Sequence, residues 1–473
     1  MDVLRLPVID ALLRWRHIRL ALQFVLLALA AVIVLHGLFG PQIAPRNLST
    51  VLTSIHWRGL LVVAVLAIGN LTCAACPMIL ARDAGRRFVQ PRFSWPRQLR
   101  RKWLGLGLLV LVLFAYELFD LWQRPSATAW IVLAYFGLAL LIDLLFRGAA
   151  FCKHVCPIGQ FNFVASTMAP MELQVRNLDT CGTCRTYDCI KGRSAQSEPL
   201  HVVRRGCELG LFLPAKVGNL DCTFCLDCVH ACPHDNIAIR TRLPGRELLE
   251  PGRRSGIGRL SQRPDLAALA TVFTFAALLN AFAMTAPAFT LESRLAGVLN
   301  VSSEWPVLAL LFLLSLVLVP ALLLAGAAAV TRAAAGTGAG SVGAMAIKYA
   351  FTLVPLGLGV WLAHYGFHLL TGALTIVPVT QSAAIDLFGW AALGQPAWNW
   401  AGMPPGAVYP VQAGFIFLGA CGAAGLVQAV SVRDYPDRPL VASAPWLGTI
   451  LLLAITALWI LDQPMEMRGL ALG

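Results

Sequence analysis

The chain has 473 residues, of which 58% are hydrophobic and only 13% are charged, and its formal net charge at pH 7 is +13. Soluble domains usually carry about 25% charged residues, so the composition excludes one large soluble fold and indicates a polytopic α-helical membrane protein. The basic residues gather between hydrophobic runs, most densely in 82–102. This is the pattern of positive charge kept on the cytoplasmic side of a membrane, and we expect no nucleic-acid partner.

The apolar segments predict nine transmembrane helices, because a helix needs about 20 apolar residues to cross the hydrocarbon core of a bilayer. The segments of this length are 20–39, 56–73, 103–121, 129–147, 266–287, 305–330, 347–372, 409–430 and 444–462. Arg14, Arg16 and Arg19 precede the first segment as in a signal peptide, but no small-residue cleavage site follows. We therefore expect a retained helix. Asp143 and Arg147, four residues apart in the fourth helix, predict a structural ion pair.

The segments that connect these helices alternate in their content of Lys and Arg. The rich segments are the N-terminal tail, 74–102, 148–265, 331–348 and 431–443, and the poor ones are 40–55, 122–128, 288–304 and 373–408. Because basic segments stay in the cytoplasm, the alternation predicts an N-terminus inside and a C-terminus outside, in a cytoplasmic (inner) membrane of bacterial type. Three parts follow: a four-helix membrane unit with Cys-Pro helix ends in 1–147, a cytoplasmic domain and linker in 148–265, and a five-helix membrane unit in 266–473.

The second and fourth predicted helices carry a weak internal repeat. Each ends in a cysteine pair followed by proline, in Cys73-Ala-Ala-Cys76-Pro77 and in Cys152-Lys-His-Val-Cys156-Pro157. Proline lacks an N–H donor and stops a helix, so both pairs are expected at the same depth on the cytoplasmic face. We call these four cysteines the membrane-face set. They are candidates for a third iron–sulfur centre; the alternatives are thiol redox chemistry, Cu(I) binding and two unrelated helix ends.

The most specific motif is Cys222-x2-Cys225-x2-Cys228-x3-Cys232-Pro233. In two-cluster ferredoxins a run with this spacing gives three thiolates to one [4Fe–4S] cluster and the fourth to the other cluster. The following Ile237-Ala-Ile239 is typical of the short strand that closes such a domain. The sequence therefore predicts an inserted α+β two-cluster ferredoxin-like domain. Zinc is the structural alternative, since four-cysteine zinc sites also use C-x2-C pairs.

The partner motif lies upstream as Cys181-x2-Cys184-x4-Cys189, followed by Cys207. The crossing of the fourth ligand then predicts two sets of metal-binding cysteines. The cluster-one set is Cys181, Cys184, Cys189 and Cys232, and the cluster-two set is Cys222, Cys225, Cys228 and Cys207. A single cluster beside a zinc site is the alternative. Cys421 lies alone in the eighth predicted helix, where a small apolar role is expected.

With these motifs the chain resembles the membrane polyferredoxin family of NapH-, NosR- and CcoG-like proteins over about residues 15–265. The family pairs C-x3-C-P motifs at helix ends with a cytoplasmic two-cluster ferredoxin domain. The resemblance implies electron transfer linked to the quinone pool or to the maturation of metal centres. The first motif of this chain is C-x2-C-P instead, and its five C-terminal helices have no counterpart that we can assign.

Histidines near the outer ends of the predicted helices suggest a second kind of redox site. His364 and His368 are four residues apart and share one helix face. Ionisable residues inside a membrane by default suggest function, so a quinone or haem site at these two is one hypothesis. A haem would need His36 or His56 as its second axial ligand. Hydrogen bonding within the bundle is the alternative. The Trp-rich loop 380–408 is expected at the membrane interface or against an extracytoplasmic partner.

We therefore predict a membrane-bound iron–sulfur protein that relays single electrons between cytoplasmic [4Fe–4S] clusters and a membrane redox partner. The expected role is quinol oxidation coupled to a respiratory reductase, as a quinol dehydrogenase-type oxidoreductase component. Its expected partners are the quinone pool or a membrane redox subunit, and an extracytoplasmic reductase or cytochrome. One alternative is a copper reductase or maturation factor that uses the membrane-face set; another is a redox-sensing transporter.

Overall fold

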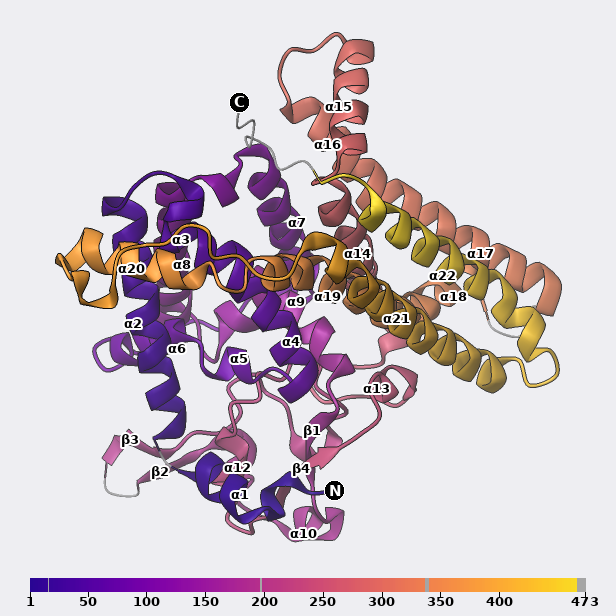
Figure 1. Cartoon of the computed structure of the whole chain (residues 1–473). Coiled ribbons are helices and arrows are strands. Elements are labelled where there is room, and N and C mark those ends of the chain that lie inside the picture. The colour runs from indigo at the N-terminus through magenta and orange to yellow at the C-terminus, as the bar shows by residue number, and fades with distance from the viewer. Residues whose placement is uncertain (16, 196–197, 337–339, 466–473) are drawn as a thin grey trace. The chain divides into compact units, whose positions relative to one another are not determined.

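The computed structural model describes residues 1–15, 17–195, 198–336 and 340–465 (Figure 1). By compactness the chain divides into two units, each built from three stretches. The first consists of Met1–Leu29, Ala64–Leu106 and Ala134–Arg263, and the second of Ala30–Val63, Gly107–Leu133 and Pro264–Gly473. We call them the cysteine unit, which holds every cysteine except Cys421, and the helical unit. This division follows packing, and the three-part organisation of the sequence stays a prediction.

Eight helices of the described chain are long and apolar enough to cross a membrane, as in a multi-pass membrane protein. They are α2 (Ile18–Phe39), Leu48–Ile68, which ends in α4 (Arg58–Ile68), α8 (Pro125–Leu145), α14 (Pro264–Phe282), Trp305–Ala335 with α16 (Trp305–Leu313) and α17 (Val319–Ala335), Val342–Thr371 with α18 (Val342–Ala350) and α19 (Val354–Thr371), α21 (Pro405–Asp434) and α22 (Pro439–Asp462). They correspond to eight of the nine predicted spans.

The remaining predicted span, 103–121, is a shorter helix, α7 (Trp103–Leu118), of 16 residues. At 1.5 Å per residue such a helix extends about 24 Å, less than the hydrocarbon core of about 30 Å. Length alone therefore supports eight spans in the described chain, and the nine-span topology stays a prediction. The C-terminus, which the sequence places outside the cytoplasm, lies outside the described residues.

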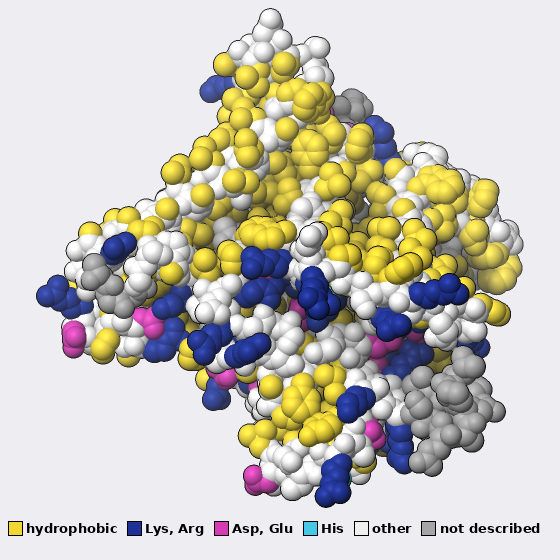
Figure 2. Space-filling model, turned by 180° about the vertical axis from the view of Figure 1, so that it is seen from behind, with side chains coloured by type: hydrophobic (Ala, Val, Ile, Leu, Met, Phe, Trp, Pro, Cys, Tyr) yellow, Lys and Arg dark blue, Asp and Glu magenta, His cyan; other side chains and the backbone are white. Residues whose placement is uncertain are grey.

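The surface of the helices is rich in apolar side chains. Large residues such as Trp130, Leu141 and Leu451 are more than half exposed. Soluble monomers rarely leave wide apolar patches in water, so these surfaces suit a lipid environment. Figure 2 shows hydrophobic side chains over wide areas of one face, and elsewhere on that face a gathering of Lys and Arg side chains with few acidic ones among them.

In the helical unit α19 is deeply enclosed, because residues 354–365 are all buried. Trp361 Nε1 donates to the carbonyl oxygen of Phe273 on α14 at 2.9 Å, and Gly359 lies against the backbone of Gly419 on α21. Two helices fall in segments that the sequence left as connectors, α15 (Ala286–Leu299) and α20 (Ile376–Phe388). Both are shorter than a membrane span, with 14 and 13 residues, so the search for long apolar runs did not find them.

In the cysteine unit two strands form an antiparallel pair, β1 (Met171–Val175) with β4 (Ile237–Thr241). The strand expected at Ile237-Ala-Ile239 is thus present. A second pair joins β2 (Arg193–Ala195) and β3 (Glu198–Arg204). The short helices are α1 (Pro7–Arg14), α5 (Leu71–Ala74), α6 (Pro77–Gly85), α9 (Pro157–Ala165), α10 (Leu178–Thr183), α11 (Asp188–Lys191), α12 (Asp227–Ala231) and α13 (Arg246–Leu249).

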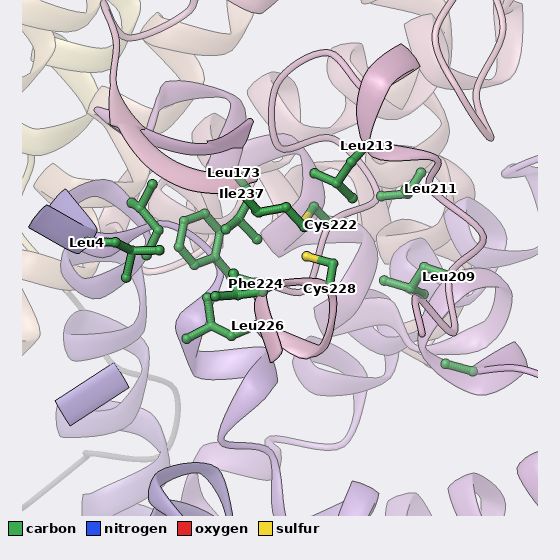
Figure 3. Packing of buried hydrophobic residues seen from close by; sticks show 13 residues of the cluster. Leu4, Leu173, Leu209, Leu211, Leu213, Cys222, Phe224, Leu226, Cys228 and Ile237 are labelled. Atoms are coloured by element: carbon green, nitrogen blue, oxygen red, sulfur yellow. The ribbon is translucent and has the colours of Figure 1, made fainter. Parts of the chain in front are cut away.

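The core of the cysteine unit is a cluster of leucines that includes two cysteines. Cys222 and Cys228 are buried in it, together with Phe224 and several leucines. Figure 3 shows the sulfur atoms of both cysteines turned into the middle of this cluster. Buried free cysteines are common in protein cores as small apolar residues, so burial alone does not make these two metal ligands.

Candidate metal centres

The two membrane-face motifs share one local structure. After α4 comes Gly69 with a φ of +69°, and after α8 comes Gly148 with a φ of +75°. A glycine in the left-handed conformation commonly ends a helix, because glycine has no Cβ and adopts a positive φ without steric cost. In both motifs the first cysteine, Cys73 or Cys152, follows this glycine by four residues and lies in a short helical turn. The cysteines therefore lie beyond the membrane helices, not at their ends as the sequence suggested.

The second cysteine of each motif begins a further helix. Cys76 is the N-cap of α6 and Cys156 the N-cap of α9, and a proline follows each of them. Proline suits this first helical position, where its missing N–H has no partner to lose. The Cys156 Sγ accepts the backbone N–H of Gly159 at 3.2 Å. The positive end of a helix favours a thiolate, so both caps suit a metal-binding sulfur.

The four sulfurs of the membrane-face set belong to one neighbourhood. Burial raises the pKa of Cys156, and the nearby thiols of Cys73 and Cys76 raise it further. Burial also raises the pKa of Cys152, as do Asp143 and the thiols of Cys156 and Cys76. Thiols that hold each other protonated in this way release protons when a cation binds between them. The arrangement suits a shared metal centre more than isolated thiols.

The cluster-one set lines a single cavity. Cys181, Cys184 and Cys189 come from α10, α11 and the loop between them, and Cys232 comes from the end of α12. Asn236 Nδ2 donates to the Sγ of Cys181 at 3.3 Å. Two segments about 50 residues apart therefore bring four thiols around one space, with the crossing that the spacing predicts.

The cluster-two set lines a second cavity. Cys222, Cys225 and Cys228 are on the loop before α12 and on its first turn, and Cys207 lies on the loop after β3. Cys152 of the membrane-face set lines the same cavity. Leu209, Leu211 and Leu213 of the core lie beside Cys222 and Cys228 in Figure 3. The donors around both cavities are thiols with apolar side chains beside them, such as Leu211 in the second cavity and Phe212 in the first, which fits a [4Fe–4S] cluster in each.

The loops that hold these cysteines contain left-handed residues other than glycine. Phe224 and Leu226, which flank Cys225, have φ angles of 56° and 62°, and Tyr187 before Cys189 has a φ of 52°. Such conformations are rare for bulky side chains and suggest a functional constraint. Turns of this kind point successive backbone N–H groups into one concavity, as around many iron–sulfur sites. The backbone is therefore shaped for an anionic group between the cysteines.

A four-cysteine zinc site is the structural alternative to a cluster at each cysteine set. Within the described residues, no three His, Cys, Asp or Glu side chains lie close enough to bind one ion. Each ligand of a [4Fe–4S] cluster binds a different iron atom, so the thiolates stand farther apart than around zinc. The choice between a cluster and zinc at each set stays a prediction from the cysteine spacing.

The thiols differ in their exposure to water. Burial raises the pKa of Cys225 and of Cys228 well above the ordinary value of a thiol. The pKa of the partly buried Cys184 is lowered to about 7, chiefly because the backbone N–H of Tyr187 stabilises its thiolate. The cluster-one set is therefore the one nearer to solvent, and the cluster-two set the one shielded from it.

Two of the predicted histidines in the helical unit have polar atoms near both ring nitrogens. His36 Nδ1 accepts the backbone N–H of Leu48 at 2.9 Å, and its Nε2 lies 3.1 Å from Asp386 Oδ2. The ring nitrogens of His56 lie 3.2 and 3.3 Å from two carbonyl oxygens. Both ring nitrogens of His36 are therefore engaged, so the structure gives no support to its role as an axial ligand. A neutral His56 can donate to only one of its two carbonyl oxygens, and its role stays a prediction.

His364 and His368 lie together on α19, with ring centroids 5.0 Å apart. His364 is buried, and His368 Nε2 is buried without a hydrogen-bond partner. Arg58 stacks on Tyr116 and Tyr365 beside them, with its guanidinium 4.0 and 5.6 Å from the two ring centroids. The pair therefore stays a candidate for binding a quinone oxygen.

Arg82 is a residue that the sequence did not single out. Its side chain is 1% exposed, pairs with Glu208 at 2.7 Å and with Asp83 at 2.9 Å, and lies 3.9 Å from Asp143. The predicted ion pair between Asp143 and Arg147 is wrong, because Arg82 is the base beside Asp143 in the described chain. The segment 82–102 contains many basic residues, so the sequence alone does not show that this one is buried.

Part of the chain is similar in sequence to membrane polyferredoxin-type proteins. The chain is 24% identical to the regulatory protein NosR of Stutzerimonas stutzeri over 174 residues, which cover 33% of this chain and 22% of that protein. It is 32% identical to the ferredoxin-type protein NapH of Escherichia coli over 114 residues, or 24% of this chain and 36% of NapH. YccM of Escherichia coli is 31% identical over 94 residues, 20% of this chain and 22% of YccM.

Over these 94 to 174 residues the chain resembles membrane polyferredoxin-type proteins. The expected resemblance is thereby confirmed for a part of the chain. The chain spans between about a fifth and a half of the length of the curated relatives it matches. No family model matches the chain. No solved structure matches it either.

Proposed function

We propose that the protein is a membrane iron–sulfur electron-transfer protein with two [4Fe–4S] clusters, one held by the cluster-one set and one by the cluster-two set. The observation that carries the proposal is that the eight cysteines of the two sets line two cavities, one set around each, and that Cys152 also lines the second cavity. The crossing of Cys207 and Cys232 between the segments has the arrangement of a two-cluster ferredoxin. The names of the ferredoxin-type relatives support the same chemistry.

The order of the sites suggests a route for single electrons. The cluster-one set lies nearer to solvent, so it suits exchange with a soluble donor or acceptor. Cluster two shares its cavity with Cys152, so it suits exchange with the membrane-face set. When bound, each cluster takes up and releases one electron, and the surrounding residues of this chain orient it and exclude water. We place the ferredoxin-like domain on the cytoplasmic side of a bacterial-type inner membrane, because the basic connectors favour that orientation.

We further propose that the membrane-face set holds a third iron–sulfur centre and that the membrane partner is the quinone pool, linked to a respiratory reductase. Three of these thiols hold each other protonated, and both motifs place a sulfur at a helix start. His364 and His368, with Arg58 beside them, are candidates for the quinone site. A copper reductase or maturation factor is the second candidate function, because soft thiols also bind Cu(I).

Metal and sulfide content of the anaerobically purified chain tests these proposals. About eight irons per chain with two cluster signals in EPR supports the ferredoxin-like domain, and about twelve adds a centre at the membrane face. Replacing the four membrane-face cysteines with Ser should then remove about four irons and leave both EPR signals. If the iron content is unchanged and copper binding is lost, the set is a copper site. A chain with no iron overturns the proposed function.

A further inference from the structure

Three of the four cysteines in the cluster-two set have an acidic neighbour in the sequence. These neighbouring pairs are Cys207-Glu208, Asp221-Cys222 and Asp227-Cys228. Each carboxylate therefore lies one residue from a sulfur that lines the cluster-two cavity. Negative charge beside a cluster opposes the addition of an electron. A positive charge next to each carboxylate would offset this effect and make the cluster easier to reduce.

Each carboxylate pairs with a basic residue from a different membrane-proximal segment of the cysteine unit. The ion pairs are Arg82–Glu208 at 2.7 Å, Lys102–Asp221 at 2.5 Å and Arg19–Asp227 at 2.8 Å. Arg82 lies in α6, which begins at the membrane-face motif, Lys102 directly precedes α7, and Arg19 lies in the first turn of α2. The three bases are more than 15 residues apart from one another, so no local repeat explains the pattern.

The burial of these pairs separates them from surface ion pairs. Lys102 and Asp221 are 2% and 4% exposed. Arg82 is 1% exposed and its partner Glu208 23%, and the third pair, Arg19 with Asp227, is 20% and 15% exposed. Exposed ion pairs contribute little, whereas removing one partner of a buried pair leaves an uncompensated charge in a weakly screening environment. The Arg14–Asp235 pair lies near the cluster-one set, has a similar length of 2.6 Å and leaves Asp235 59% exposed. It provides a matched surface comparison.

Two hydrogen bonds also join the cluster-two loop and the membrane-face motifs to each other and to Lys102. Asn70, beside the first glycine of the membrane-face repeat, donates its amide to the carbonyl oxygen of Cys222 at 3.1 Å. Lys102 Nζ also donates to the carbonyl oxygen of Lys153, next to Cys152, at 2.8 Å. Lys102 thus contacts both the cluster-two loop and the membrane-face motif.

We propose that Arg82, Lys102 and Arg19 are positioning residues that clamp the cluster-two loops through their acidic neighbours and set the reduction potential of cluster two. The inference rests on the proposed function, because it needs a cluster in the second cavity. The clamp holds cluster two against the membrane-face motifs and supplies the positive charge that an added electron requires. We expect these three residues to have no effect on the potential of cluster one, whose nearby ion pair is exposed.

The test is a redox titration followed by EPR on the full-length protein, with each cluster read separately. Arg82→Gln and Lys102→Gln remove one positive charge near cluster two. A charge about 10 Å from a cluster at an effective dielectric constant of about 20 changes the reduction equilibrium about tenfold. We expect cluster two to become harder to reduce by this factor, about 59 mV for one electron, and cluster one to stay unchanged. Arg14→Gln is the matched control and should shift neither potential.

A double variant separates charge from a purely structural effect. Arg82→Gln combined with Glu208→Gln restores local neutrality, so the potential of cluster two should return toward that of the unchanged protein. If a Gln variant loses its cluster, Arg82→Lys and Lys102→Arg keep the charge and should retain both the cluster and its potential. Loss of cluster two in these charge-keeping variants overturns the proposal. So does an unchanged potential in Gln variants with full iron. A chain that carries no clusters before substitution contradicts the proposed function instead.

Discussion

The backbone N–H of Cys207 donates to the carbonyl oxygen of Cys189 at 3.0 Å, and this bond joins the two cysteine sets directly. Cys189 belongs to the cluster-one set and Cys207 to the cluster-two set. The close approach depends on Gly206, because a Cβ added there would overlap the backbone of Gly192 and of Ile190. The link gives the two proposed clusters a fixed separation along a backbone contact.

Gly206→Ala should disturb both cysteine sets. The added methyl group forces the two backbone segments apart, and overpacking of this kind typically costs about 1–3 kcal/mol. We expect lower iron retention and a lower thermal midpoint in detergent. Gly182→Ala is the matched control, because nothing lies within 4 Å of the position its Cβ would take. Equal iron retention in the two variants would show that the approach at Gly206 is not needed.

The crossing of the fourth ligands makes a distinct spectroscopic prediction. Cys232→Ser should alter the same EPR signal as Cys181→Ser, although Cys232 follows Cys228 by only four residues. Cys207→Ser should alter the same signal as Cys222→Ser. Each single variant is expected to lose up to about four irons. If Cys232→Ser and Cys228→Ser affect the same signal, the ligand sets are local in sequence and the assignment of cavities to clusters is wrong.

Much of the candidate site could be predicted from the sequence because cysteine spacing is a covalent constraint. The run from Cys222 to Cys232 fixes which sulfurs can share a cluster. The long apolar segments were equally clear, since membrane spanning demands length. What the sequence lacked was the helix break at Gly69, because one glycine in an apolar run looks like a tolerated interior residue. The Arg82 contacts were also hidden, because ion pairs between distant segments leave no local pattern.

Glu247→Gln should destabilise the loop that leads to Cys222. The buried Glu247 carboxylate accepts the backbone N–H groups of Asn219 at 2.6 Å and Leu220 at 3.2 Å, and it pairs with Arg242. Neutralising one partner of a buried pair costs about 3–5 kcal/mol. We expect the cluster-two signal to disappear at lower denaturant concentration in detergent. Glu250→Gln, at an exposed position, is the control and should behave as the unchanged protein does.

His36→Ala tests whether this histidine has a structural role or a cofactor-binding one. Its side chain is fully buried and joins α2 to Leu48 and to Asp386 of α20 through both ring nitrogens. Losing two buried hydrogen bonds should lower the thermal stability in detergent by about 1–3 kcal/mol. Electron transfer to a quinone analogue by the folded fraction should stay unchanged, since neither nitrogen is free to bind a cofactor. The exposed His17→Ala is the control. Unchanged stability together with lost quinone reduction would identify His36 as part of the redox site instead.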